Sequence, residues 1–150
     1  MKHLFIILIW VSSSFLTFAQ EVIKSTLIIN DSLFSANNIG QYQFTHSTGG
    51  VSHNAEDINQ YIRVVNDTLF FNISYGGGCG LVEQTLATDG VLKWDKLNRP
   101  YFEVHFYFND QDMCKALRHK SLSFDLKNIL EDQGELYIQL DDFKHKIRIR

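Results

Sequence analysis

The sequence predicts an all-β protein, an antiparallel β-sandwich of about eight to ten strands with one or two short helical turns. Three observations support this fold class. β-branched and aromatic residues recur at period two in several segments, which is the pattern of half-buried strands. Polar turn residues separate these segments at short intervals, and the chain contains a single proline, Pro100. No stretch with helical periodicity is long enough to organise a helical core.

The first 19 residues have the features of a secretory signal peptide. A basic residue precedes an apolar stretch from Leu4 to Val11, and three serines then interrupt it. Thr17 and Ala19 are the small residues that signal peptidase reads, so we expect cleavage before Gln20. An uncleaved membrane anchor is the alternative, but a spanning helix needs roughly 20 continuous apolar residues. The sequence predicts an exported protein, periplasmic or secreted, without stable membrane insertion after cleavage.

The remaining chain, residues 20–150, is the size of one domain. Loss of Lys2 with the signal peptide leaves 13 basic against 17 acidic side chains. Domains that bind nucleic acid usually carry a basic surface patch. The mildly acidic composition therefore argues against nucleic acid as a partner.

The chain has two cysteines, Cys79 and Cys114, and both follow the predicted cleavage site. Thiols in an oxidising compartment usually pair, so we expect a structural disulfide. A reactive thiol or a metal-binding pair is the alternative, but neither cysteine lies in a metal-type spacing. The chain-entropy model assigns a bridge of this span about 3.5–4 kcal/mol.

The predicted strands begin with Val22 to Ile29. The clearest unit is a hairpin, in which Tyr61–Val65 and Thr68–Tyr75 flank Asn66 and Asp67. These two turn residues tolerate the left-handed backbone of a tight turn. The residues expected on the buried face of the second strand are Leu69, Phe71, Ile73 and Tyr75.

The segment from Tyr101 to Phe108 is predicted as a long strand. Its apolar side, which should face the core, consists of Phe102, Val104, Phe106 and Phe108. Before it, Val82–Ala87 and Val91–Trp94 are expected to flank a turn at Thr88–Gly90.

Later segments complete the predicted fold. Alternation around Leu122 and Phe124, and again from Leu136 to Leu140, predicts two more half-buried strands. Lys144–Arg150 should pair back as a C-terminal hairpin, with its basic row protecting a sheet edge. Three segments are candidates for the one or two short helical turns, namely Asn54–Gln60, Asp112–Arg118 and the stretch between Asp125 and Leu130.

One internal similarity links Ile28–Phe34 with Val64–Phe70. A duplicated hairpin would produce it. Two unrelated hairpins with the same turn chemistry would also produce it, and the short match favours this second interpretation.

Glycines surround the first cysteine, at Gly76, Gly77, Gly78 and Gly80. A phosphate-binding loop would need Lys followed by Ser or Thr and then a helix, whereas here another predicted strand follows. Glycines at a strand end more often permit a bulge or a close approach of two backbones. A ligand lying against exposed backbone is the alternative, which makes Gly76, Gly77 and Gly78 candidate binding residues.

The outward side of the predicted 101–108 strand is the strongest candidate for recognition. It carries Tyr101, Glu103, His105 and Tyr107, which we call the outer strip. Aromatic rings beside polar groups stack on sugars or anchor protein partners. Cross-strand pairing on a solvated face is the structural alternative.

No motif indicates a catalytic residue, a metal site or a cofactor. Asn109–Asp112 clusters oxygen ligands, but it lacks the glycine and terminal glutamate of the helix-loop-helix calcium motif. No pair of histidines has the spacing of a helical metal site. A nucleophile elbow of the Gly-x-Ser-x-Gly type is also absent from the sequence. We therefore expect a protein that is not an enzyme.

One pattern resembles a known group. Ser74–Cys79, then Asp112 and Cys114, then Leu122–Leu126 resemble small exported bacterial proteins of unknown function, some similar to the β-sandwich part of NigD-like proteins. The resemblance covers about Val64–Ile149 and implies the disulfide and the sandwich. Such proteins often carry a histidine shortly after the first cysteine, where this chain has Val82 and Glu83. No activity follows from the resemblance.

Together these observations predict a non-catalytic binding or interaction module outside the cytoplasm, with an unknown protein or glycan as partner. Two alternatives stay open. A small inhibitor of an extracytoplasmic hydrolase or protease would use an exposed loop such as His46–Asn54. An enzyme without a recognisable motif would assemble its histidines and acids only in the fold.

Overall fold

The computed structural model describes residues 22–45, 61–77, 79–111, 116–130, 134–141 and 143–150. The predicted signal peptide lies outside them. The strands in these ranges are β1 (Val22–Thr26), β2 (Ile28–Ile29), β3 (Tyr42–Thr45), β4 (Ile62–Val65), β5 (Thr68–Gly76), β6 (Val82–Thr88), β7 (Leu92–Trp94), β8 (Pro100–Asp110), β9 (Leu117–Asp125), β10 (Tyr137–Leu140) and β11 (Ile147–Arg148). Two short helical elements accompany them, the helix α1 (Asp31–Phe34) and the 3₁₀ turn η2 (Lys127–Ile129).

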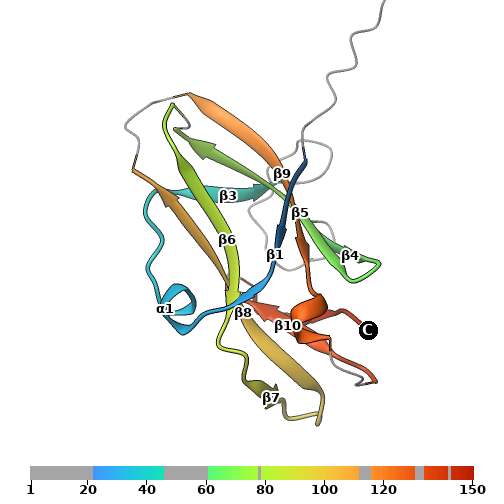
Figure 1. The fold of residues 1–150 in the computed structure, drawn as a ribbon. Helices are drawn as coiled ribbons and strands as arrows, with labels where there is room; N and C mark the ends of the chain where they lie inside the picture. The colour runs from blue at the N-terminus through green and yellow to red at the C-terminus, as the bar shows by residue number, and fades with distance from the viewer. Residues whose placement is uncertain (1–21, 46–60, 78, 112–115, 131–133, 142) are drawn as a thin grey trace, which may run out of the picture.

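The strands form two sheets (Figure 1). One has the order β1-β9-β5-β3, with β4 also on β5, and the other has the order β11-β10-β8-β6-β2, with β7 also on β8. The all-β class is confirmed. The expectation of purely antiparallel sheets is wrong, because β1 on β9, β2 on β6 and β10 on β8 are parallel pairs. These pairs join segments far apart in the sequence, so local patterns do not encode their direction.

The apolar faces of the two sheets meet through aromatic rings. The Phe106 ring centroid on β8 lies 5.1 Å from that of Phe71 on β5 and 6.1 Å from that of Phe124 on β9. Phe108 lies 5.2 Å from Tyr75 in the same way. The predicted buried faces of the 68–75 and 101–108 strands are confirmed, since all eight side chains are buried.

The predicted first strand, Val22–Ile29, divides between the two sheets. Leu27 is fully buried at the crossing point. Its N–H donates to the Asp125 carbonyl at 2.9 Å, and its own carbonyl accepts from the Asn128 side-chain amide at 2.9 Å. Because these bonds hold the backbone at the crossing, β1 stays on β9 while β2 pairs with β6.

The two similar segments adopt different structures. Asn66 and Asp67 have φ of 49° and 61° and form the predicted tight turn between β4 and β5. In Ile28–Phe34, Asn30 instead caps α1, with its Oδ1 accepting from the Leu33 N–H at 3.0 Å. Both hairpin interpretations of Ile28–Phe34 are therefore wrong. An Asn-Asp pair suits either a left-handed turn or a helix start, and the surrounding fold selects between them.

The predicted turn at Thr88–Gly90 is instead a bulge, which lies between β6 and β7 where both pair with β8. β6 and β7 both run antiparallel to β8, with Ala87 opposite His105 and Leu92 opposite Phe102. The stretch between these pairs is two residues longer on the β6–β7 side, which lets that strand bend without leaving β8. The chain reverses later, between Trp94 and Pro100.

Of the expected helical turns, the one between Asp125 and Leu130 is confirmed as η2. Asn54–Gln60 lies outside the described residues. Within Asp112–Arg118, residues 112–115 also lie outside them, while Leu117 and Arg118 belong to strand β9 rather than to a helix. The C-terminal hairpin is confirmed by the antiparallel pair of β10 and β11.

Candidate functional site

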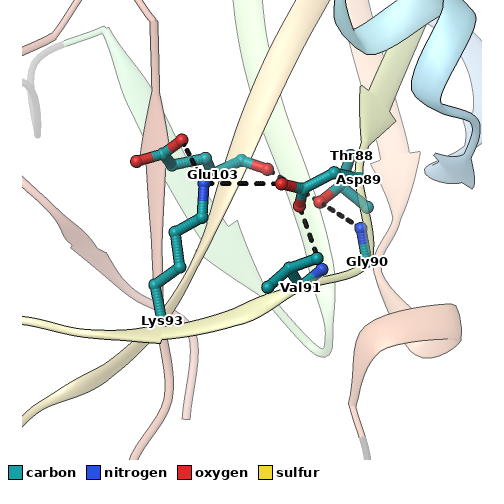
Figure 2. Close-up of polar contacts among 6 residues, drawn as sticks. All are labelled: Thr88, Asp89, Gly90, Val91, Lys93 and Glu103. Atoms are coloured by element: carbon teal, nitrogen blue, oxygen red, sulfur yellow. Dashed lines mark hydrogen bonds and ion pairs between the residues drawn. The ribbon is translucent and has the colours of Figure 1, made fainter.

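The outer strip lies on the face of β8 that points away from the core, and its four side chains are partly buried. Glu103 is held by Lys93 on β7, whose Nζ lies 2.6 Å from Glu103 Oε2 and 3.4 Å from Asp89 Oδ2 (Figure 2). The hydrogen bond to Glu103 raises the pKa of Lys93 above its ordinary value. Glu103 therefore already has a cationic partner within its own sheet, which it shares with Asp89.

The bulge between β6 and β7 builds this arrangement (Figure 2). The Thr88 hydroxyl donates to the Glu103 carbonyl at 2.7 Å and accepts from the Gly90 N–H at 3.2 Å. Asp89 Oδ1 accepts from the Val91 N–H at 2.9 Å. The side chains of Thr88 and Asp89 thus form hydrogen bonds with backbone groups at the point where the bulge interrupts the strand pairing.

Two further members of the outer strip also have close partners. The Lys146 ammonium lies 4.1 Å from the centre of the Tyr101 ring, and His105 Nδ1 contacts Asp141 Oδ2. His105 Nε2 is buried without a hydrogen-bond partner among the described residues. These contacts favour the structural interpretation of the outer strip, because a ligand would have to displace pairs already made within the sheet.

The glycine run has two different environments. Gly77 is buried with a φ of 139°, and a Cβ there would overlap the Asp110 carboxylate. Gly76 is exposed, and a Cβ there would meet no atom within 4 Å. Gly78 lies outside the described residues. The absence of a side chain at Gly77 therefore lets the Asp110 carboxylate lie close to the backbone, whereas Gly76 faces open space.

The pairing of Cys79 with Cys114 stays a prediction, because Cys114 lies outside the described residues. The register of the neighbouring ladder supports it. In the antiparallel ladder of β5 and β9, Gly76 lies opposite Leu117, and the Gly77 N–H donates to the Ala116 carbonyl at 2.9 Å. Cys79 lies two residues after Gly77 in the sequence and Cys114 two residues before Ala116, so the two cysteines are equally close along the chain to this bonded pair.

A groove of about 580 Å³ opens beside Gly76. It forms where the chain passes from one sheet to the other. Ile39 forms an isolated β-bridge with Asn109 on β8, and only three residues later Tyr42 pairs with Tyr75 on β5. The described residues that line the groove are Asn38, Gly40, Gln41, Tyr42, Gln43, Phe44, Ser74, Tyr75, Gly76 and Leu117.

The groove is uncharged and rich in amides. Asn38, Gln41 and Gln43 contribute side-chain amides, Ser74 contributes a hydroxyl, and no described lining residue is charged. The wall is fixed by the fold. Asn38 Oδ1 accepts from the Phe108 N–H at 2.8 Å, and the Tyr42 ring centroid lies 5.1 Å from that of Phe106.

The sequence identified Gly76 as a candidate binding residue, but it did not identify the groove residues that lie between Asn38 and Phe44. The alternation of Gln41, Tyr42, Gln43 and Phe44 is the signal that identifies β3. Nothing local indicates that the preceding residues bridge to β8, because that contact joins positions 70 apart in the chain.

The other candidate residues are brought together to a smaller extent. In the oxygen-rich segment Asn109–Asp112, Asp110 is buried beneath Gly77 and the Asn109 amide donates to Glu83 at 3.0 Å, while Asp112 lies outside the described residues. Within the described ranges no group of three His, Cys, Asp or Glu is placed to hold a metal ion. A second pocket of about 400 Å³, lined by Lys24, Phe70 and Asp125 among others, lies on the outer face of the first sheet.

No family model and no curated protein matches the chain. Two solved structures resemble it. One, a Parabacteroides distasonis protein described only as toxin-related, has a TM-score of 0.51 and 11% identity over 85% of this chain. The other, a DUF1344 protein of unknown function from Bacteroides vulgatus, has a TM-score of 0.50 and 13% identity over 86% of this chain. At these identities the likeness shows the fold alone.

The chain spans 59% and 56% of the lengths of these two structures. The similarity to NigD-like proteins stays a prediction. Among the described residues, no helix has both the length and the apolar character to cross a membrane.

Proposed function

We propose that this protein is an exported, non-catalytic binding module whose ligand occupies the groove beside Gly76. The observation that carries the proposal is the groove itself, which has the volume of a small-ligand site. Its walls are held by core packing and by the hydrogen bond from the Phe108 N–H to the Asn38 side chain, so binding would require little ordering of the protein.

The ligand class that fits best is a neutral glycan. Amides and hydroxyls donate and accept hydrogen bonds, as sugar hydroxyls do. A charged ligand would leave its charge unpaired, because the described lining carries none. The half-buried residues Tyr42 and Phe44 add apolar surface to the lining of the groove.

The test fills the groove without touching the core. Gly76→Val would place a side chain in open space and should leave folding intact, since nothing lies within 4 Å of its Cβ position. Gly134→Val is the matched control, because Gly134 is also exposed and also has no atom within 4 Å. Amide chemical shifts would be followed while a panel of neutral oligosaccharides is added to each protein.

We expect saturable shifts at Gln41, Gln43 and Gly76 in the wild type and in Gly134→Val. Gly76→Val should bind at least about tenfold more weakly, because the added side chain would occupy space that the ligand needs; tenfold corresponds to about 1.4 kcal/mol. Equal binding by Gly76→Val would contradict the proposal. If Tyr101→Ala and Tyr107→Ala abolished binding while Gly76→Val did not, the site would be assigned to the outer strip instead.

The two alternatives have no structural observation in their favour. The inhibitor hypothesis depends on His46–Asn54, which lies outside the described residues. The enzyme hypothesis needs a histidine and a carboxylate in one pocket. His105 and Asp141 do contact each other, but they line neither of the two pockets described above.

A further inference from the structure

The turn that joins β7 to β8 exposes two large apolar side chains. Trp94 is 58% exposed and Leu97 is 71% exposed. They are three residues apart in one tight turn, which Trp94 and Pro100 close as a strand pair. Two large exposed apolar side chains in one turn make this turn a candidate interaction surface.

The turn is rigid rather than loose. Asp95 Oδ1 accepts from the N–H groups of Leu97 at 2.9 Å and Arg99 at 3.0 Å. The Asp95 N–H donates to the Arg99 carbonyl at 3.1 Å, and Asn98 takes a left-handed φ of 57°. These bonds hold Leu97 at the tip, so its exposure is built into the turn.

The turn is also basic, although the whole chain has a net charge of −3. Its only carboxylate, on Asp95, lies 2.8 Å from Arg99 and 3.6 Å from Lys146. Lys96 adds a further exposed cation. Residues 95–99 together with Lys146 therefore carry three cations and one acid, while the neighbouring Lys93 is paired with Glu103 and Asp89.

From these observations we infer that this turn binds the surface of an anionic lipid bilayer, inserting Trp94 and Leu97 between the headgroups. Tryptophan prefers the membrane interface, and neighbouring cations are attracted to anionic headgroups. The inference does not depend on the groove. The turn and the groove lie near opposite ends of β8 (Figure 1), because β8 runs from Pro100 to Asp110 and Asp110 contacts the groove residue Gly40. A bilayer bound at the turn would leave the groove accessible.

The fluorescence of Trp94 tests this directly. The chain has two tryptophans, and the other, Trp10, lies in the predicted signal peptide. In the processed protein the emission reports on Trp94 alone; where the leader is retained, Trp10→Phe achieves the same. Vesicles of phosphatidylglycerol mixed with phosphatidylcholine would be added, with pure phosphatidylcholine vesicles as the neutral comparison.

We expect a blue shift of the Trp94 emission with the anionic vesicles. Leu97→Ser should weaken partitioning about tenfold, the effect of losing one buried leucine side chain. Lys96→Glu should weaken it on anionic vesicles and leave it unchanged on neutral ones. The control is Leu81→Ser, because Leu81 is 95% exposed and directly precedes β6, away from the turn; this variant should bind as the wild type does.

Three results would overturn the inference. One is an emission maximum that anionic vesicles do not move. Another is equal weakening by Leu81→Ser and Leu97→Ser, which would indicate non-specific adsorption. The third is a blue shift that follows protein concentration without lipid, which would assign the turn to contact with a second copy of the chain.

Discussion

At the end of β5, Gly76 and Gly77 follow one another but face different surroundings. Gly77 has a left-handed backbone and lies against Asp110, whereas Gly76 is exposed beside the groove. A sequence pattern records two glycines and cannot distinguish them. The distinction depends on β8, whose last residue, Asp110, is brought beneath Gly77 by the packing of the two sheets.

We predict that Gly77→Ala destabilises the protein by about 2–4 kcal/mol. The added Cβ would overlap the Asp110 carboxylate, and an alanine would have to adopt a strained backbone conformation. Urea unfolding of the variant would measure the loss. Gly76→Ala is the matched control and should unfold within about 0.5 kcal/mol of the wild type. Equal stability of the two variants would show that Gly77 is not constrained.

Among the elements, β8 is the one that its own residues predict best. Its alternation from Tyr101 to Phe108 sets the buried face because period two is a local property of a strand. The bulge between β6 and β7 was not predictable in this way. Thr88, Asp89 and Gly90 have the composition of a turn, and only pairing of both flanking segments with β8 makes them a bulge.

The turn between β7 and β8 gives a pH prediction. Hydrogen bonds from the Arg99 backbone and side chain, with a further one from Leu97, lower the pKa of Asp95 from 3.8 to about 2. A carboxyl with a lowered folded-state pKa stabilises the fold above its unfolded pKa. That stabilisation disappears as the pH falls from about 4 to about 2.

Urea unfolding of the wild type and Asp95→Asn across this range would measure the effect. The wild type should be more stable than Asp95→Asn at pH 5, and the difference should vanish toward pH 2. Arg99→Gln, which removes the ion pair from the other side, should reduce the same pH dependence. A difference between the wild type and Asp95→Asn that is constant with pH would contradict the assignment.

At the scale of the whole molecule, the two sheets are joined by crossings of the chain. One is at Leu27 and another is between Ile39 and Tyr42, where the groove forms. The predicted disulfide would add a covalent link between the segments that follow β5 and precede β9. This end of the molecule also holds Gly76, so its stability bears on the proposed site.

We predict that Cys79→Ser lowers the free energy of unfolding by about 3.5–4 kcal/mol, the loss of the loop restraint in the unfolded chain. Cys114→Ser should have the same effect, and the double variant should be no worse than either single one. Intact mass before and after reduction would establish the bridge, since it removes two hydrogens. Wild type that unfolds identically when oxidised and reduced would refute the structural role of the bridge.

Local residue patterns were sufficient to predict the β class, the buried faces of the longest strands, the Asn66–Asp67 turn and the C-terminal hairpin. These depend on side-chain periodicity and on local backbone preferences, which neighbouring residues specify. Tertiary structure alone decided the three parallel strand pairs, the division at Leu27 and the groove between Asn38 and Gly76. Each of these results from contacts between segments far apart in the chain, and no local pattern encodes which distant partner a strand edge will meet.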